Sequence, residues 1–296
     1  MNIISLLKQT YTEWSNDKAT RLGAALSFYT ILSIAPLVVV AAAVATLFVG
    51  ADAVQSQLHE TLSGLMGLNG AKAIEDMAAA NSANRGTGAF SAVVGILTLI
   101  FAASGVFAEL QDSLNTIWGV KTKPGAGWAS LIRDRFLSLS MVLGTGFLLL
   151  VSLLVSAVLA GVGKYVSGAL PGGELLWSII NFVFSLAVIA FLFAMIFKYV
   201  PDVVIKWRDA LPGAFVTALL FVIGKELIGL YLGRSSVSSA YGAAGALILV
   251  LLWVYYVSQI FFFGVEFTQV LAAARGSGLI PSANAIRVSS RRFANP

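Results

Sequence analysis

Ionisable and amide side chains inside long apolar stretches are the residues of this sequence best suited to chemistry. Lys225 and Glu226 are neighbours in one such stretch, and Gln259 and Glu266 lie seven residues apart in another. A charged residue at the centre of a membrane helix costs about 2.5–3.5 kcal/mol on insertion scales, so each needs a partner or a wet cavity. These four residues are our first candidates for a substrate or ion path.

Each of these residues also has a structural interpretation. Adjacent side chains on a helix point about 100° apart, so Lys225 and Glu226 are not expected to pair with each other. They would instead snorkel toward an interface or pair with another helix. Gln259 and Glu266 share one helix face, which indicates that this face lies against protein, for a substrate or for a helix-packing hydrogen bond. The sequence leaves both interpretations open.

An acidic and amide-rich patch follows the apolar stretch that ends near Ala108. Its members are Glu109, Gln111, Asp112 and Asn115. The spacings i, i+3 and i, i+4 place them in pairs on common helix faces. The patch is a candidate for binding a cation or a headgroup amine. The alternative is a helix junction that pairs with Arg133 or Arg135.

Basic residues near the N-terminus are candidates for binding lipid headgroups. Lys18 and Arg21 precede the first apolar stretch and would meet anionic phosphates or serve as interfacial anchors. Pro36 lies within that stretch and would break one intrahelical hydrogen bond. We therefore expect an amphipathic N-terminal helix over residues 18–34 at the membrane interface, a helix break at Pro36, and a span from there.

The signatures of soluble enzymes are missing. His59 is the only histidine and there is no cysteine, which excludes disulfides, cysteine nucleophiles and the usual zinc sets. Neither a P-loop nor a Gly-x-Ser-x-Gly motif occurs, and basic and aromatic residues do not interleave as an RNA-binding surface requires. We expect no catalytic residue, no metal, no cofactor and no nucleic-acid partner.

Composition indicates the elements that must position these residues. Hydrophobic residues make up 58% of the chain and charged residues only 11%, against roughly 25% charged in soluble domains. Six stretches reach the roughly 20 apolar residues of a membrane span, at about 26–49, 89–108, 136–160, 175–197, 211–232 and 243–273. Backbone groups in lipid must be satisfied internally, so the spans are helices. The sequence predicts an all-α polytopic membrane protein with one membrane domain over residues 1–274.

Lysine and arginine indicate the orientation. Of the 19, 14 fall in one set of connections, four in the other, and Lys225 within a span. The larger set is Lys8, Lys18, Arg21, Lys121, Lys123, Arg133, Arg135, Lys198, Lys206, Arg208, Arg275, Arg287, Arg291 and Arg292. The positive-inside rule then predicts an inner-membrane protein with both termini cytoplasmic. The outer connection 51–88 has the apolar spacing of two short amphipathic helices, and we expect the basic tail 275–296 to be disordered.

Three stretches resemble the YihY/virulence factor BrkB family of bacterial inner-membrane proteins. They are AALSFYTILSIAP at 24–36, ASGVFAELQDSLNTIW at 103–118, and YGAAG at 241–245 with the LLWVYY and FGVEF that follow it. The resemblance implies six spans, a cytoplasmic N-terminus and a suspected role in transport or lipid handling. The family has also been labelled ribonuclease BN, a label for which these residues supply no chemistry.

Two hypotheses of function follow. The first is a secondary transporter or lipid-handling channel without ATPase activity, with membrane lipids as partners. The second is a non-transporting scaffold that docks an envelope protein through residues 51–88. A membrane enzyme ranks below both because no nucleophile–base pair is present, and a homo-oligomer stays open.

Overall fold

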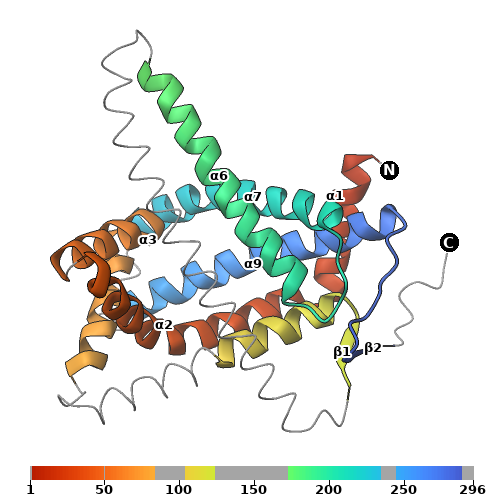
Figure 1. The fold of residues 1–296 in the computed structure, drawn as a ribbon, viewed down its shortest axis with the longest axis horizontal. Helices are drawn as coiled ribbons and strands as arrows, with labels where there is room; N and C mark the ends of the chain where they lie inside the picture. The colour runs from red at the N-terminus through yellow and green to blue at the C-terminus, as the bar shows by residue number, and fades with distance from the viewer. Residues whose placement is uncertain (1, 50, 84–103, 124–172, 235–244, 289–296) are drawn as a thin grey trace. The chain divides into compact units, whose positions relative to one another are not determined.

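The computed structural model describes residues 2–49, 51–83, 104–123, 173–234 and 245–288. The described helices are α1 (Ile3–Asn16), α2 (Ala19–Val49), α3 (Ala51–Ala83), a helix over 104–117, α6 (Gly173–Tyr199), α7 (Trp207–Arg234) and α9 (Gly245–Ala274). Two short strands, β1 (Val120–Thr122) and β2 (Ala285–Arg287), complete the described elements (Figure 1). The expectation of a mainly helical membrane protein is confirmed.

Three described helices are long and apolar enough to cross a membrane. They are Ser178–Tyr199 in α6, Trp207–Ile228 in α7 and Leu247–Ala274 in α9. They coincide with the last three spans expected from the sequence. The first expected span, 26–49, falls in α2, of which Ala19–Ile34 is apolar but shorter than a span. The span at 136–160 and most of the span at 89–108 lie outside the described residues, so the total of six stays a prediction.

The chain divides into two compact units. Unit 1 comprises residues 1–9, 115–219 and 264–296, and unit 2 comprises residues 10–114 and 220–263. Helices α1, α7 and α9 and the helix over 104–117 contribute residues to both units. Each unit is described by itself below.

The core of unit 2 joins α2, α3 and the first half of α9. Ile31 of α2, Leu62 and Ile74 of α3, and Val250 and Val254 of α9 are buried together. The wholly buried Ile74 shows that the predicted outer connection 51–88 is not a simple surface segment, because part of it belongs to this core.

Helix α3 cannot be straight. His59 Nδ1 and Glu75 Oε1 are 2.9 Å apart although 16 residues separate them, and a straight helix would span about 24 Å over that length. The segment therefore folds back on itself, and the His59–Glu75 contact joins its two arms.

The N-terminal region differs from expectation. A separate helix, α1, precedes α2, and Lys18 lies in the turn between them with a left-handed φ of 54°. Helix α2 then continues through Pro36 to Val49, so the helix break expected at Pro36 is absent from the described backbone. Proline removes one backbone donor, which a long helix can tolerate when neighbouring turns persist.

Unit 1 is organised by close contact between α7 and α9. A methyl group built on Gly213 would lie 1.8 Å from Thr268 Oγ1, and one built on Gly264 would lie 1.7 Å from Thr217 Oγ1. The later α7 residue meets the earlier α9 residue, so the helices are antiparallel. Each helix carries the same Gly-x-x-x-Thr pattern, and each threonine hydroxyl donates to the carbonyl of its own helix's glycine at 2.8 Å. The absence of a glycine side chain permits this approach.

A two-stranded antiparallel sheet orders part of the C-terminal tail. Strand β1 pairs with β2, with Lys121 opposite Ile286, and Val203 bridges to Pro281 (Figure 1). The expectation of a disordered tail from residue 275 is therefore wrong for residues 275–288, because these residues find backbone partners in two distant connections. Residues 289–296 lie outside the described part of the chain.

The α7–α9 contact gives a stability prediction. We expect Gly264→Ala to destabilise the protein by about 1–3 kcal/mol, as overpacking does, because the new methyl group meets both Oγ1 and Cβ of Thr217. Thermal unfolding in detergent measures the effect. Gly278→Ala is the matched control because nothing lies within 4 Å of its added methyl group. Equal melting temperatures for the two variants would contradict the described contact.

Candidate functional site

Gln259 of unit 2 has a buried side-chain amide. A methyl group built on Gly23 of α2 would lie 2.0 Å from its Nε2, so the amide is pressed against the α2 backbone. Both its Oε1 and Nε2 are buried, and neither has a hydrogen-bond partner among the described residues. The neighbouring Ser258 hydroxyl, in contrast, donates to the carbonyl of Val254 at 2.8 Å. A buried amide without partners is unfavourable by about 1–3 kcal/mol, so its presence calls for a reason.

Glu266 is buried in unit 1. Its exposed fraction is 0%, and it lies on α9 two residues from both Gly264 and Thr268, so it points about 200° around the helix from the face that meets α7. A carboxylate in an apolar span is unfavourable unless it is paired or protonated. Gln259 and Glu266 are seven residues apart, about two helical turns, and so share a stripe along α9.

Lys225 and Glu226 do not behave as expected. Lys225 Nζ lies 3.3 Å from Glu226 Oε1, so the two neighbours form an ion pair. The angular argument failed because both side chains are long enough to bend toward each other from different faces. The exposed fraction of the Glu226 side chain is 72% and that of Lys225 is 32%. Neither is enclosed by the described residues, which favours the structural interpretation of this pair.

The four members of the acidic and amide-rich patch differ in burial. Asn115, the most buried of its four members, faces Asp202 in unit 1: its Nδ2 donates to Asp202 Oδ2 at 2.9 Å, and its Oδ1 accepts from the Asp202 backbone N–H at 2.8 Å. The Thr122 hydroxyl also donates to Asp202. Asn115 therefore links a helix end to the connection before α7, a structural role. Gln111 is half-buried and Asp112 exposed, while Arg133 and Arg135 lie outside the described residues.

Glu109 has a perturbed acidity. It lies just beyond the predicted second span, and partial burial, followed by the nearby charge of Asp112, raises the pKa of its carboxyl. Lys18, in the turn before α2, and Arg21, in the first turn of α2, are both exposed. Such exposure suits headgroup contact and interfacial anchoring equally. Among the described residues no group of three histidine, aspartate or glutamate side chains is placed to hold a metal ion.

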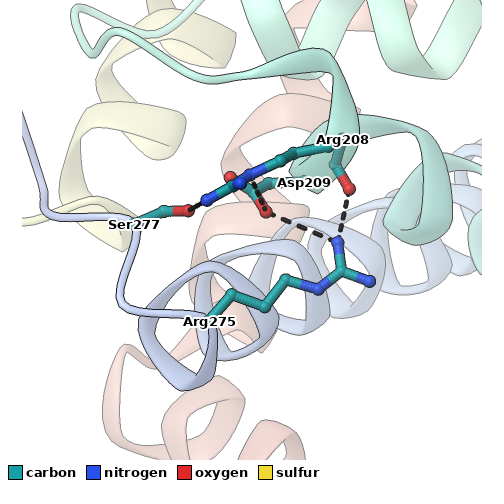
Figure 2. A network of polar contacts seen from close by, with 4 residues as sticks. All are labelled: Arg208, Asp209, Arg275 and Ser277. Atoms are coloured by element: carbon teal, nitrogen blue, oxygen red, sulfur yellow. Dashed lines mark hydrogen bonds and ion pairs between the residues drawn. The ribbon is translucent and has the colours of Figure 1, made fainter.

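Sequence reasoning missed an arginine cluster at the ends of α7 and α9. Arg275 Nη1 donates to the backbone carbonyl of Arg208 and lies 3.4 Å from Asp209 Oδ1 (Figure 2). Arg208 Nη2 donates to the Ser277 hydroxyl at 3.2 Å. In the sequence, Arg208 and Arg275 serve only as markers of orientation. The one available signal was that both lie at the same predicted end of two spans.

The raised pKa of Glu109 gives a pH prediction. Its folded pKa exceeds its unfolded pKa, so ionised Glu109 destabilises the folded state, and the penalty disappears as the pH falls through the raised value. We expect Glu109→Gln to raise the melting temperature at neutral pH and to lose that advantage in acid. Melting curves across a pH series test this. Asp112→Asn should shift the profile in the same direction but less, because its charge is the smaller cause.

The Asn115–Asp202 contact gives a second prediction. Asn115→Ala removes two hydrogen bonds to the connection that holds the tail, and should expose residues 275–288 to trypsin, which cleaves after Arg275 and Arg287. Thr116→Ala, at an exposed position on the same helix, should leave the cleavage rate unchanged. Equal rates for both variants would show that Asn115 does not hold the tail.

The sequence is similar to a known family of membrane proteins. The family described as Virulence factor BrkB matches residues 10–285. A UPF0761 membrane protein of Albidiferax ferrireducens is 29% identical over 255 residues, covering 84% of this chain and 57% of that protein. A UPF0761 membrane protein of Stenotrophomonas maltophilia is 27% identical over 277 residues, covering 92% of this chain and 62% of that protein. A third, of Tolumonas auensis, is 31% identical over 182 residues, covering 60% of this chain and 57% of that protein.

The chain thus spans less than two thirds of the length of these relatives. No solved structure matches it. The family match covers nearly the whole chain, the relatives are membrane proteins by description, and three described helices have the length and apolarity of spans. The chain is a multi-pass membrane protein and belongs to the BrkB family.

Proposed function

We propose that this protein is a secondary transporter or lipid-handling channel of the bacterial inner membrane, without ATPase activity of its own, and with both termini cytoplasmic. The observation that carries the proposal is the buried amide of Gln259, which is pressed against Gly23 and has no partner among the described residues. A purely structural helix contact would be more stable with an apolar side chain in this position.

An unsatisfied amide favours a second conformation. Parting α2 from α9 at Gly23 would let water or a polar ligand reach Gln259, which would offset part of the free energy of separation. The contact therefore has the properties of a gate in its closed state. A polar solute or a lipid headgroup that hydrogen-bonds the amide is the kind of ligand that such a gate would pass.

The orientation rests on the positive-inside rule. The connections 118–123, 200–206 and 275–288 lie together in unit 1 through Asn115, Asp202 and the β1–β2 pair. All three carry lysine or arginine that the sequence assigns to one side. Their common location supports placing that side in the cytoplasm.

The scaffold hypothesis also has support. Glu266 is buried and Gln259 is pressed against Gly23, while the Lys225–Glu226 pair is not enclosed by the described residues. Both observations fit a closed bundle. Leu68 of α3 is 70% exposed and offers a contact for an envelope protein partner. The experiment below separates the two functions.

The absence of cysteine from the chain makes the gate testable by a single introduced thiol. Ser258 is buried, and its Cβ lies 3.5 Å from a methyl group built on Gly23. In lipid nanodiscs we expect Ser258→Cys to react slowly with a water-soluble maleimide, as α2 and α9 part transiently. Adding Gln259→Met should slow this labelling by on the order of tenfold, because the unsatisfied amide no longer favours opening.

Gly278→Cys, at an exposed tail position, controls for reagent activity and should label equally in both backgrounds. A Ser258→Cys thiol that stays unlabelled until the protein is denatured would contradict the gate and favour the scaffold. An equal labelling rate with and without Gln259→Met would remove the role proposed for the amide.

A further inference from the structure

Two arginines from different helix ends line an open pocket of about 480 Å³ in unit 1. Arg208 lies in the first turn of α7, and Arg275 directly follows the last turn of α9. The two helices are antiparallel, so these ends meet on the same side of the protein. Figure 2 shows the guanidinium of Arg275 beside the backbone of Arg208, with Asp209 between the two side chains.

The pocket carries a net positive charge. Among the residues that the structure describes, Asp209 is the one acid paired with these arginines, and its Oδ1 lies 3.4 Å from Arg275 Nη1 and 3.9 Å from Arg208 Nε. Its side chain is only 2% exposed, so it is held beneath the arginines and does not compete at the surface. One carboxylate balances one of two guanidinium groups, which leaves one positive charge directed at the pocket.

Donors remain free on both arginines. Arg275 donates through Nη1, and Arg208 donates through Nη2 and makes a long ion pair through Nε. No partner among the described residues is present for the remaining donors, which are Nε and Nη2 of Arg275 and Nη1 of Arg208. The Arg208 side chain is 61% exposed and that of Arg275 is 41% exposed. Asp209 and the Arg208 carbonyl thus fix the position of Arg275 while leaving the rest of its planar fork available to a ligand.

The surroundings place the pocket at the level of lipid headgroups. The membrane-spanning part of α7 begins at Trp207, one residue before Arg208, and that of α9 ends at Ala274, one residue before Arg275. The Trp207 ring stacks on Phe191 and lies edge-on to Tyr199, and Lys198 Nζ lies 5.5 Å from the centres of the Tyr199 and Trp207 rings. Aromatic rings combined with basic groups are typical of the membrane–water interface.

We propose that the Arg208–Arg275 pocket binds a phosphate group at the membrane surface. Planar arginine forks match the paired oxygens of a phosphate, and basic pockets between membrane helices recognise anionic headgroups. The phosphate belongs to an anionic phospholipid or is free in solution, and the position of the pocket favours the lipid. This site is separate from the gate at Gln259 and does not depend on it.

The test uses the full chain in nanodiscs of phosphatidylcholine with or without phosphatidylglycerol, and in detergent with inorganic phosphate against chloride at equal ionic strength. Thermal unfolding reports stabilisation, and native mass spectrometry reports retained lipid. We expect phosphatidylglycerol to raise the melting temperature of the wild type. Arg208→Gln should weaken apparent lipid affinity roughly tenfold, the loss of one charge-assisted contact.

Lys206→Gln is the matched control, because it removes the same charge two residues away from a side chain that does not line the pocket. It should retain wild-type affinity. Arg275→Lys keeps the charge beside Asp209 and loses the fork, so it should fold normally and bind phosphatidylglycerol more weakly. This variant carries the test if Arg208→Gln does not fold.

The outcomes are distinct. Stabilisation by phosphatidylglycerol that depends on Arg208 and Arg275 supports a lipid headgroup, and stabilisation only by inorganic phosphate with the same dependence supports a free phosphate ligand. Equal losses of apparent lipid affinity in Arg208→Gln and Lys206→Gln would show a general attraction to an anionic surface. That result would overturn the proposal of a specific site. No stabilisation by either probe would overturn it as well.

Discussion

The close approach of α7 and α9 is the constraint on which the rest of unit 1 depends. Gly213 and Gly264 each leave room for a threonine of the other helix, and each threonine hydroxyl is satisfied within its own helix. The contact therefore needs no hydrogen bond between helices. It brings the start of α7 and the end of α9 together, and so determines where Arg208, Asp209 and Arg275 meet.

The described polar residues are of two kinds, those whose hydrogen bonds are satisfied and those with unused donors or acceptors. Asn115 and Asp202 satisfy each other and organise backbone, as structural polar groups do. Gln259 and the pocket-lining arginines retain unused donors or acceptors among the described residues. Groups of the second kind are unfavourable or idle in a closed, ligand-free protein, which makes them the stronger candidates for binding a ligand.

The sequence predicted the helical class and the last three spans, because apolar length alone determines which segments enter lipid. It also identified Gln259 and Glu266, since polar residues stand out in an apolar helix. Prediction from the sequence failed where contacts with distant residues, or the reach of long side chains, determined the structure. Strand β2 has three residues and becomes ordered only through β1, and Lys225 pairs with its neighbour because long side chains can bend. The matching Gly-x-x-x-Thr patterns were present, but 28 glycines gave no reason to single them out.

The pairing of β1 with β2 has a consequence for the order of assembly. Strand β1 is synthesised before α6, α7 and α9, whereas β2 follows all three, so the sheet can close only when those helices have been made. Until then Lys121 and its neighbours have no strand to pair with. A closed sheet is thus a late landmark of maturation, and a chain whose last helix has not reached its place would present an unpaired edge to the cell's membrane proteases.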